Sequence, residues 1–553
     1  MNFIYNESAQ KLRGGYYTPL DLAVFAAKWV AGIKPDNILE PSCGDGAFLQ
    51  ALAESGYTKG KTTAIELDPV EAHKAKVRAQ QIAIKANVLN EDFLGWALDR
   101  LDKPGQRFDA VLGNPPFIRY QYLPEAFQVE AQKIFAVLGC KFTKHTNAWV
   151  PFVLASIQML RPGGRLCMVV PSEIIHVLHA QSLRSFLLGK CRKVVLIDPE
   201  EIWFEDTLQG AVLLMAEAKT DESVETEGLG LVPVRGRGFL NIDPESVFND
   251  AEAIAPKAIS AKWTRAFLSH DQREMLDAAI ARPYVRWFKD VADVDVGIVT
   301  GANKFFLVND DTVATYGLEK WTHPMFGRSE HCPGIVYDKA QHKRNKKAGL
   351  PANFLWFPDA SVLNDRAVAK YIKTGEKDRL QDRYKCRIRK NWYSVPSVFS
   401  TPIGMLKRSH STPKMILNKA GAFSTDTAYR IRILDGQAEA FVSNFINPLT
   451  ALSAELEGRT YGGGVLELVP SEIERLLVPS LSHPVNAIEV VDKAIRTMKM
   501  ADVQLTLGMS VLTALDFNEG EKKMIYDGWI QLMSRRQRVE AEPDAEQDLV
   551  DLN

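Results

Sequence analysis

The stretch Phe108–Phe117, FDAVLGNPPF, joins an apolar run typical of a buried strand to a turn with two successive prolines. Proline lacks an N–H group and restricts the backbone to extended conformations, so this turn presents carbonyl oxygens. Asn114 adds a side-chain carbonyl and Phe117 adds an aromatic ring. A plain proline-rich turn gives no reason for Asn and Phe at these places. We therefore interpret Asn114-Pro115-Pro116-Phe117 as a functional loop at the end of a strand.

Short apolar runs alternate with helical patterns on both sides of this stretch, up to about residue 215. The expected strands are 37–40, 62–67, 83–88, 108–113, 165–170, 194–198 and 211–215. The expected helices include 47–55, a segment from residue 69, and 147–160. This alternation predicts an α/β domain with a mostly parallel, seven-stranded sheet that helices cover on both faces. Ligands of such sheets bind outside the carboxyl ends of the strands.

Three further strand ends carry residues suited to a nucleotide-like ligand. The first expected strand ends in Glu40–Gly46, EPSCGDG, whose glycines allow a tight turn and close backbone approach. The second ends at Glu66, about 20 residues beyond the turn, where a carboxylate can accept hydrogen bonds from ribose hydroxyls. Asp92 and Phe93 follow the third, where they could bind an adenine amino group and cover its ring. Each feature alone is equally typical of an ordinary loop.

In this order, the residues resemble the N6-adenine DNA methyltransferases of type II restriction–modification systems, in the gamma arrangement. The resemblance covers roughly residues 10–215, beginning with Gly15–Pro19. It implies a Rossmann-like class I methyltransferase domain with S-adenosyl-L-methionine as cofactor. It also implies methyl transfer to the N6 amino group of an adenine flipped out of double-stranded DNA.

The resemblance assigns roles to individual residues. Those expected to bind the cofactor are Tyr17, Thr18, Pro19, Glu40, Ser42, Gly44, Gly46, Glu66, Asp92 and Phe93. Those expected to carry catalysis are Asn114, Pro115, Pro116 and Phe117. Phe117 and Phe204 are expected to stack on the target base, with Trp203 competing for the second place. No metal site is expected.

The second half of the chain is expected to recognise DNA. The acidic segment 217–233 is interpreted as a boundary after a catalytic domain of residues 1–220. We expect a mixed α+β target-recognition domain at 234–480, a helical segment at 484–535 and a disordered acidic tail at 540–553. Segments 297–303 and 461–466 are similar to parts of larger type II methylases, without an assignable chemistry.

The whole chain has 67 Lys and Arg against 68 Asp and Glu, a net charge of −1 that argues against nucleic acid. Residues 370–419, however, contain thirteen Lys and Arg and three acids, a local charge of +10. Cations neutralise phosphates, and Arg can read base edges, so we expect DNA to bind here. The residues expected to bind DNA are Lys343, Arg344, Lys385, Arg387, Arg389, Lys390, Trp392, Lys407 and Arg408. A solvated basic face remains the alternative.

The remaining features of the sequence limit the class of protein. The N-terminus lacks a signal-peptide pattern, no apolar run reaches 18 residues, and no two cysteines form a C-x-x-C pair. We therefore expect a cytoplasmic enzyme without a membrane span, acting beside a separately encoded restriction endonuclease. The oligomeric state and the recognition sequence stay open. So do two alternatives: methylation of RNA adenine or protein glutamine, and a non-catalytic DNA-binding specificity subunit.

Overall fold

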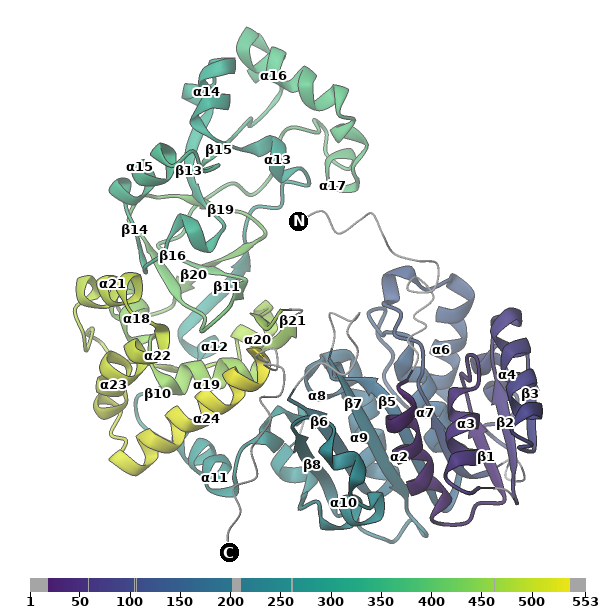
Figure 1. The fold of residues 1–553 in the computed structure, drawn as a ribbon. Coiled ribbons are helices and arrows are strands. Elements are labelled where there is room, and N and C mark those ends of the chain that lie inside the picture. The colour runs from purple at the N-terminus through teal and green to yellow at the C-terminus, as the bar shows by residue number, and fades with distance from the viewer. Residues whose placement is uncertain are drawn as a thin grey trace, which may run out of the picture. The chain divides into compact units, whose positions relative to one another are not determined.

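The computed structural model describes residues 18–57, 59–103, 105, 107–200, 210–259, 262–461 and 463–537. It divides into a first unit that ends at Leu268 and a second unit, Ser269–Gln537 (Figure 1). The expectations for Tyr17, Trp203, Phe204 and the tail 540–553 fall outside the described residues. Each unit has sheets and an apolar core of its own.

The first unit contains one sheet in the order β3-β2-β1-β4-β5-β7-β6-β8-β9. The strands are β1 (Asn37–Glu40), β2 (Lys61–Ile65), β3 (Ala86–Leu89), β4 (Phe108–Gly113), β5 (Leu160–Pro171), β6 (Cys191–Pro199), β7 (Ala211–Ala218), β8 (Gly228–Val234) and β9 (Ala253–Ile254). The strands β3, β2, β1, β4 and β5 run parallel, and β7 runs antiparallel to both β5 and β6. This confirms the predicted class I methyltransferase fold, but the described sheet has nine strands and not the predicted seven, because β8 and β9 extend it beyond β6.

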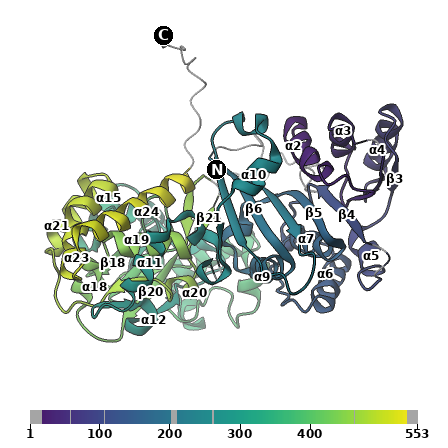
Figure 2. The ribbon, with the colours of Figure 1, turned by 90° about the horizontal axis from the view of Figure 1, so that it is seen from below.

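Helices cover both faces of this sheet. They are α2 (Leu20–Ala31), α3 (Ala47–Glu54), α4 (Pro69–Gln81), α5 (Phe93–Leu98), α6 (Glu125–Val137), α7 (Trp149–Gln158), α8 (Glu173–His176), α9 (Gln181–Lys190) and α10 (Pro244–Asp250). Figure 2 shows α2, α3 and α10 on one face and α6 and α9 on the other. The first group shares a core with alternate residues of the central strands, whereas α7 and α9 contact β5 and β6 from the opposite side.

Side-chain caps fix where the helices after β2 and β3 begin. Asp68 accepts hydrogen bonds from the N–H groups of Val70 and Glu71, and Pro69 occupies the first turn of α4. Asp92 accepts from the N–H of Gly95 at 3.0 Å and so starts α5. Such caps satisfy donors that a helix terminus leaves unpaired. Both carboxylates therefore hold the strand-to-helix turns at the carboxyl edge of the sheet.

The boundary between the units differs from the predicted one. The segment expected as a linker contains β8, which pairs in parallel with β6, and β9 then pairs with β8. Residues 234–268 consequently pack with the first unit, and the boundary lies between Leu268 and Ser269. The pairing partner of β8 lies more than 30 residues earlier in the chain, at Lys193–Pro199, so local composition did not reveal it.

The second unit is built on several smaller sheets. Their strands are β10 (Val285–Trp287), β11 (Ala292–Val296), β12 (Leu307–Val308), β13 (Thr322–Phe326), β14 (Val336–Tyr337), β15 (Asn353–Leu355), β16 (Ile403–Leu406), β17 (Arg408–Ser409), β18 (Met415–Asn418), β19 (Phe423–Ser424), β20 (Ala428–Ile433), β21 (Arg459–Tyr461), β22 (Val465–Glu467) and β23 (Leu477–Pro479). The five-stranded sheet β11-β20-β16-β18-β14 and the four-stranded sheet β12-β15-β13-β19 are the largest. This is the mixed architecture expected for the second half.

Helices pack around these sheets. They are α11 (His270–Ala279), α12 (Phe288–Val291), α13 (Asn303–Phe306), α14 (Asp310–Tyr316), α15 (Lys339–Lys347), α16 (Arg366–Lys377), α17 (Tyr384–Arg387), α18 (Ala438–Asn444), α19 (Pro448–Glu457), α20 (Pro470–Ile473), α21 (Ile488–Thr497), α22 (Met500–Val503), α23 (Met509–Ala514) and α24 (Glu519–Gln537). None of the helices in the described ranges is both long and apolar enough to cross a bilayer.

A buried ion pair holds α24 against α19. Both Arg536 and Glu455 are almost fully buried, and Arg536 donates two hydrogen bonds of 2.8 Å to the Glu455 carboxylate. The guanidinium also donates to the carbonyls of His410, Ser411 and Gly464. Burial raises the pKa of Glu455, and the hydrogen bonds from Arg536 oppose that rise. One side chain therefore ties the last described helix to two loops.

Removing Arg536 should loosen α24. In Arg536→Met the Glu455 carboxylate stays buried without its partner, which costs about 3–5 kcal/mol. We expect faster amide hydrogen exchange along α24, measured by mass spectrometry, and a lower unfolding midpoint in urea. Lys523→Met, on an exposed side chain of the same helix, is the control. Wild-type exchange in Arg536→Met would show that the pair does not hold the helix.

Candidate active site

The turn after β1 brings backbone close to the ends of two strands. Gly44 and Gly46 have positive φ angles of 51° and 90°, which side chains rarely tolerate. A Cβ on Gly46 would lie 3.2 Å from the Cα of Ala75 in α4. The N–H of Cys43 donates to the carbonyl of Ile65 at 2.9 Å, which attaches the turn to β2. The glycines therefore allow a turn that larger residues would push away from the sheet.

The Glu66 carboxylate is fixed above this turn. Its Oε2 accepts from the N–H of Gly44 at 2.9 Å, and its Oε1 accepts from the N–H of Asp68 at 2.9 Å. Asn90 donates from Nδ2 to the carbonyls of Glu66 and Leu67, which joins the ends of β2 and β3. The Leu67 side chain is 67% exposed beside the carboxylate. Sequence reasoning missed Leu67, although an apolar residue just past a strand end was a visible signal.

Glu40 is a fully buried carboxylate at the end of β1. It is 0% exposed, and neither carboxylate oxygen has a hydrogen-bond partner among the described residues. Burial raises its pKa well above the usual value, and the nearby Glu66 and Asp45 raise it further. A buried charge is costly unless it is paired. The site is therefore suited to a ligand that brings positive charge.

The Asn114 loop meets the glycine turn and the N-terminal motif. The Asn114 carbonyl accepts from Ser42 Oγ at 2.9 Å, and the Asn114 Nδ2 donates to Thr18 Oγ1 at 3.2 Å. Pro115 is buried, and Phe117 is half-buried against the core beneath the sheet edge. The structure thus brings together three expected motifs that are far apart in the sequence.

A hydrogen-bonded bridge supports the segment just after this loop. The Asn147 side chain is 7% exposed, and its Oδ1 accepts from the N–H of Tyr120 at 3.1 Å. Its Nδ2 donates to Glu173 Oε2 at 2.8 Å, and the N–H of Ala148 donates to the carbonyl of Ile118 at 3.0 Å. Because Glu173 follows β5, the bridge anchors residues 118–120 to the end of a neighbouring strand. Sequence reasoning missed this role of Asn147.

The structure changes the expectation for Phe93. Its ring is 2% exposed and packs against Phe152 and Trp96, so core packing holds it and it presents no open face. The neighbouring Asp92 lies at the carboxyl edge beside Glu130 of α6. Burial and the adjacent Asp92 raise the pKa of Glu130. Asp92 thus remains a candidate for contact with a ligand, whereas Phe93 does not offer an open stacking surface.

The expected DNA-binding residues of the second unit fall into two groups. Lys343, Arg344, Lys385, Arg387 and Lys390 are exposed. Of these, Arg344 also donates to Gln341 Oε1 at 2.8 Å. The other four, of which Arg408 is exposed as well, have partners within the protein. Arg389 donates to the carbonyls of Val299 and Trp392, and Lys407 and Arg408 both pair with Glu467. The Trp392 ring lies 5.0 Å from that of Phe305 and packs over Gly375.

Comparisons with known proteins match two separate parts of the chain. Residues 48–203 match the family described as Eco57I restriction-modification methylase, and residues 260–512 match the C-terminal domain of type II methyltransferase M.Eco57I. The chain belongs to the type II restriction–modification methyltransferases.

Individual relatives match between a third and more than four fifths of this methyltransferase. M.AccI of Acinetobacter calcoaceticus is 23% identical over 482 residues, which cover 83% of this chain and 84% of the relative. M.TthHB8I of Thermus thermophilus is 32% identical over 188 residues, 33% of this chain and 40% of the relative. Among solved structures, the DrdV–DNA complex covers 77% of this chain and 50% of its own, at 13% identity and a TM-score of 0.46. The fold assignment itself rests on the strand order described above.

S-adenosylmethionine is the cofactor of the methyltransferase. The site fits it, because the molecule carries a sulfonium and an ammonium group and Glu40 is a buried carboxylate without a hydrogen-bond partner in the described structure. The glycine turn beside Glu40 allows the close backbone approach that such a ligand needs.

Asn147 should act as a positioning residue for the methyltransferase loop. In Asn147→Ala the N–H of Tyr120 and the Glu173 carboxylate lose their shared partner, so the loop loses its anchor. We expect kcat to fall about 10–100-fold, the size of effect that small misplacements of reacting groups produce. The dissociation constant for S-adenosylmethionine, measured by calorimetry, should change little. Equal loss of cofactor binding and turnover would instead indicate general unfolding of the site.

Proposed function

We propose that the enzyme transfers a methyl group from S-adenosylmethionine to the N6 amino group of an adenine in double-stranded DNA. The observation that carries this proposal is the convergence on Asn114 of the glycine turn, through Ser42, and of the N-terminal motif, through Thr18. The motifs that we propose to bind the cofactor therefore contact the loop that we propose to bind the acceptor base. Family membership supports DNA modification as the biological role.

The loop composition supports adenine N6 as the acceptor. The N6 lone pair is delocalised into the ring, which makes the amine a poor nucleophile. In our proposal Asn114 Oδ1 and the Pro115 carbonyl accept the two N6 hydrogens and draw the nitrogen towards tetrahedral geometry. The hydrogen bond from Asn114 Nδ2 to Thr18 fixes how the side-chain amide is oriented for this task. These acceptors act by position and electrostatics on a developing cation.

S-adenosylmethionine supplies an electrophilic methyl group with a neutral thioether as leaving group. The enzyme therefore needs no covalent intermediate with its own side chains. The proton leaves from a cationic product, so no strong general base is required. What the chain must provide is alignment of the N6 lone pair with the methyl group.

The base must leave the helix to reach this loop, which costs a few kcal/mol of unstacking. Phe117 is the aromatic residue of the described site that we propose for stacking on the extruded base. Its half-buried ring packs against the core of the first unit, which would support a stacked base. Phe204 stays a second candidate.

On the cofactor side, we propose that Glu66 binds the ribose hydroxyls and Asp92 the adenine amino group. The N–H of Gly44 donates to Glu66 Oε2 and the N–H of Asp68 donates to Oε1, which holds the carboxylate at the carboxyl end of β2. The exposed Leu67 then provides the apolar contact for the adenine ring that the buried Phe93 does not offer. Glu40 and the turn at Ser42–Gly46 would hold the methionine part.

The acceptor loop generates the first prediction of this proposal. Asn114→Ala removes an acceptor used in the transition state, so turnover should fall about 100–1,000-fold. Asn114→Asp keeps an acceptor oxygen and should retain more activity than Asn114→Ala. Cofactor affinity, measured by calorimetry, should stay within a few-fold of wild type in both. Near-wild-type methylation by Asn114→Ala would refute the proposed role.

The assay itself identifies the substrate. Incubation with labelled S-adenosylmethionine and unmethylated duplex DNA, followed by nucleoside digestion, should yield N6-methyladenine. Parallel reactions with adenine-containing RNA and with protein should stay unlabelled. Label confined to RNA or protein would overturn DNA as substrate, and absence of transfer to all three would favour a non-catalytic specificity subunit.

The basic residues give a second prediction, which separates two neighbouring arginines. Arg387 is exposed, so Arg387→Gln should weaken duplex binding and lower the slope of log affinity against log salt by about 0.9 for one lost phosphate contact. Arg389→Gln should instead lower the stability of the second unit, because it deprives the Val299 and Trp392 carbonyls of their donor. Salt-dependent fluorescence anisotropy and thermal unfolding distinguish the two. An unchanged slope in Arg387→Gln would remove this segment from the proposed DNA surface.

A further inference from the structure

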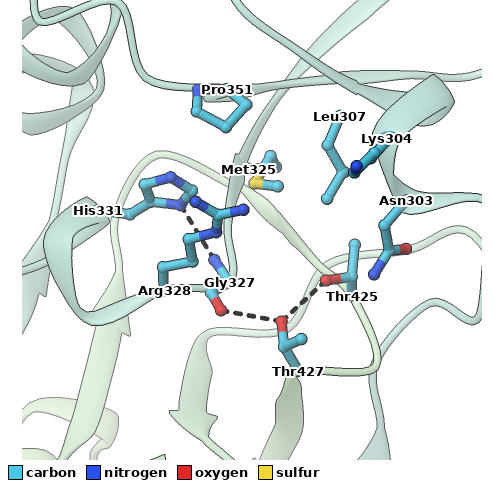
Figure 3. A pocket seen from close by; sticks show the side chains of 10 residues that line it. All are labelled: Asn303, Lys304, Leu307, Met325, Gly327, Arg328, His331, Pro351, Thr425 and Thr427. Carbon is cyan, nitrogen blue, oxygen red and sulfur yellow. Dashed lines mark hydrogen bonds between the residues drawn. The ribbon is translucent and has the colours of Figure 1, made fainter. Parts of the chain in front are cut away.

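The second unit contains a cavity of about 410 Å³ whose rim carries two cations (Figure 3). It is formed by the strand β13 and the turn after it, the helix α13, and the turn between β19 and β20. Its lining residues are Asn303, Lys304, Leu307, Met325, Gly327, Arg328, His331, Pro351, Thr425 and Thr427. Figure 3 shows Lys304 and Arg328 on opposite sides of the cavity.

The polar groups on one wall are already occupied by the protein. Thr427 donates to the Gly327 carbonyl at 2.9 Å and lies 3.0 Å from the Thr425 hydroxyl. Asn303 donates to Asp426 at 3.0 Å. These hydrogen bonds occupy the polar groups of the wall. The charges of Lys304 and Arg328 therefore determine which ligand the cavity attracts.

Among the described residues no acid lines the cavity, and Asp426, next to its threonine wall, accepts a hydrogen bond from Asn303. Lys304 is exposed and has no carboxylate within 4.0 Å among the described residues. In the part of the chain that the structure describes, Arg328 pairs with Glu330 alone, at 3.3 Å, and both side chains are well exposed, which makes such a pair weak. His331 adds no charge at neutral pH, because burial lowers its pKa to about 4. The rim therefore favours an anion.

The cavity is much larger than a phosphate and partly apolar. Leu307, Met325 and Pro351 form a surface suited to the face of a base or a sugar. A cationic rim for the phosphate, combined with an apolar wall for the base or sugar, is what a nucleotide unit needs. A free inorganic anion would leave most of this space unfilled.

The cavity is connected to the exposed basic segment through residues 297–303, a segment to which sequence reasoning could give no chemistry. On one side, the N–H of Ile298 donates to Ser424 and the N–H of Asp426 donates back to Ile298, next to the threonine wall. On the other side, Arg389 donates to the Val299 carbonyl at 2.7 Å, and Arg383 donates to the Gly301 carbonyl at 3.5 Å. The loop thus lies between the cavity and the segment that exposes Lys385, Arg387 and Lys390.

We propose that this cavity holds one nucleotide of the bound DNA, with its phosphate contacted by Lys304 and Arg328. The base or sugar then lies against Leu307, Met325 and Pro351. This inference rests on the proposed function, because it takes duplex DNA as the substrate. It assigns this cavity of the second unit a part in target binding, continuous with the basic segment of the same unit.

The test measures duplex affinity by fluorescence anisotropy across a range of salt concentrations, with the whole protein and bound S-adenosylmethionine. Lys304→Gln and Arg328→Gln should each weaken binding and lower the salt slope by about 0.9, one phosphate contact. Lys493→Gln, an exposed lysine on α21, is the matched control and should keep the wild-type slope. Both rim residues are exposed, so the variants should fold, as the wild-type melting temperature would verify.

A second measurement separates nucleotides of DNA from free ones. Titration with dAMP should show no saturable binding to the wild type at concentrations where duplex DNA saturates. Saturable binding of dAMP that Lys304→Gln abolishes, with an unchanged DNA slope, would overturn the proposal in favour of a free-nucleotide site.

Failure of this inference is distinguishable from failure of the proposed function. If the wild type methylates duplex DNA and the rim variants keep its salt slope, only the cavity assignment fails. If the wild type neither binds nor methylates duplex DNA, the proposed function fails, and the cavity assignment fails with it.

Discussion

The parallel pairing of β1 with β4 is the constraint on which the active site depends. Ile38 pairs with Ala110 and Leu39 with Val111, so the two strands end at the same edge. The strand order reverses at this point, since β2 continues from β1 on one side and β4 follows on the other. The glycine turn and the Asn114 loop must therefore emerge side by side. The hydrogen bond from Ser42 to Asn114 is a direct result of this pairing.

The sequence was sufficient for the features that depend on local patterns. Apolar runs ending at Glu40 and Gly113 predicted β1 and β4, and the fold class followed from strand–helix alternation. Features set by distant partners were not predictable. Both β8, paired with β6, and the Asn147 bridge to Glu173 depend on contacts across many residues. Phe93 shows the same limit, because its burial follows from packing against Phe152 on another helix.

The basic residues of the second unit show that a count of charges omits the partners of each cation. The local +10 of residues 370–419 treats all thirteen cations alike, whereas the structure separates them by their partners. Lys407 and Arg408 share the carboxylate of Glu467, and Arg389 stabilises a loop through carbonyl groups. Lys304, outside that stretch, has more freedom to meet a phosphate than any of these three. The surface available to DNA is therefore set by which cations lack internal partners, and the sequence does not contain that information directly.

The buried carboxylate of Glu40 would link cofactor binding to protonation in the proposed site. Its raised pKa means that the folded protein holds a proton more tightly there than the unfolded chain does, so this group contributes less to stability as the pH rises through that pKa. A cation bound beside Glu40 has the opposite preference, since it favours the ionised carboxylate. If the cationic groups of the cofactor bind beside Glu40, as we propose, binding releases a proton wherever Glu40 is protonated in the free enzyme. In that proposal the same carboxylate that lowers the stability of the folded protein at high pH strengthens the binding of a positively charged methyl donor.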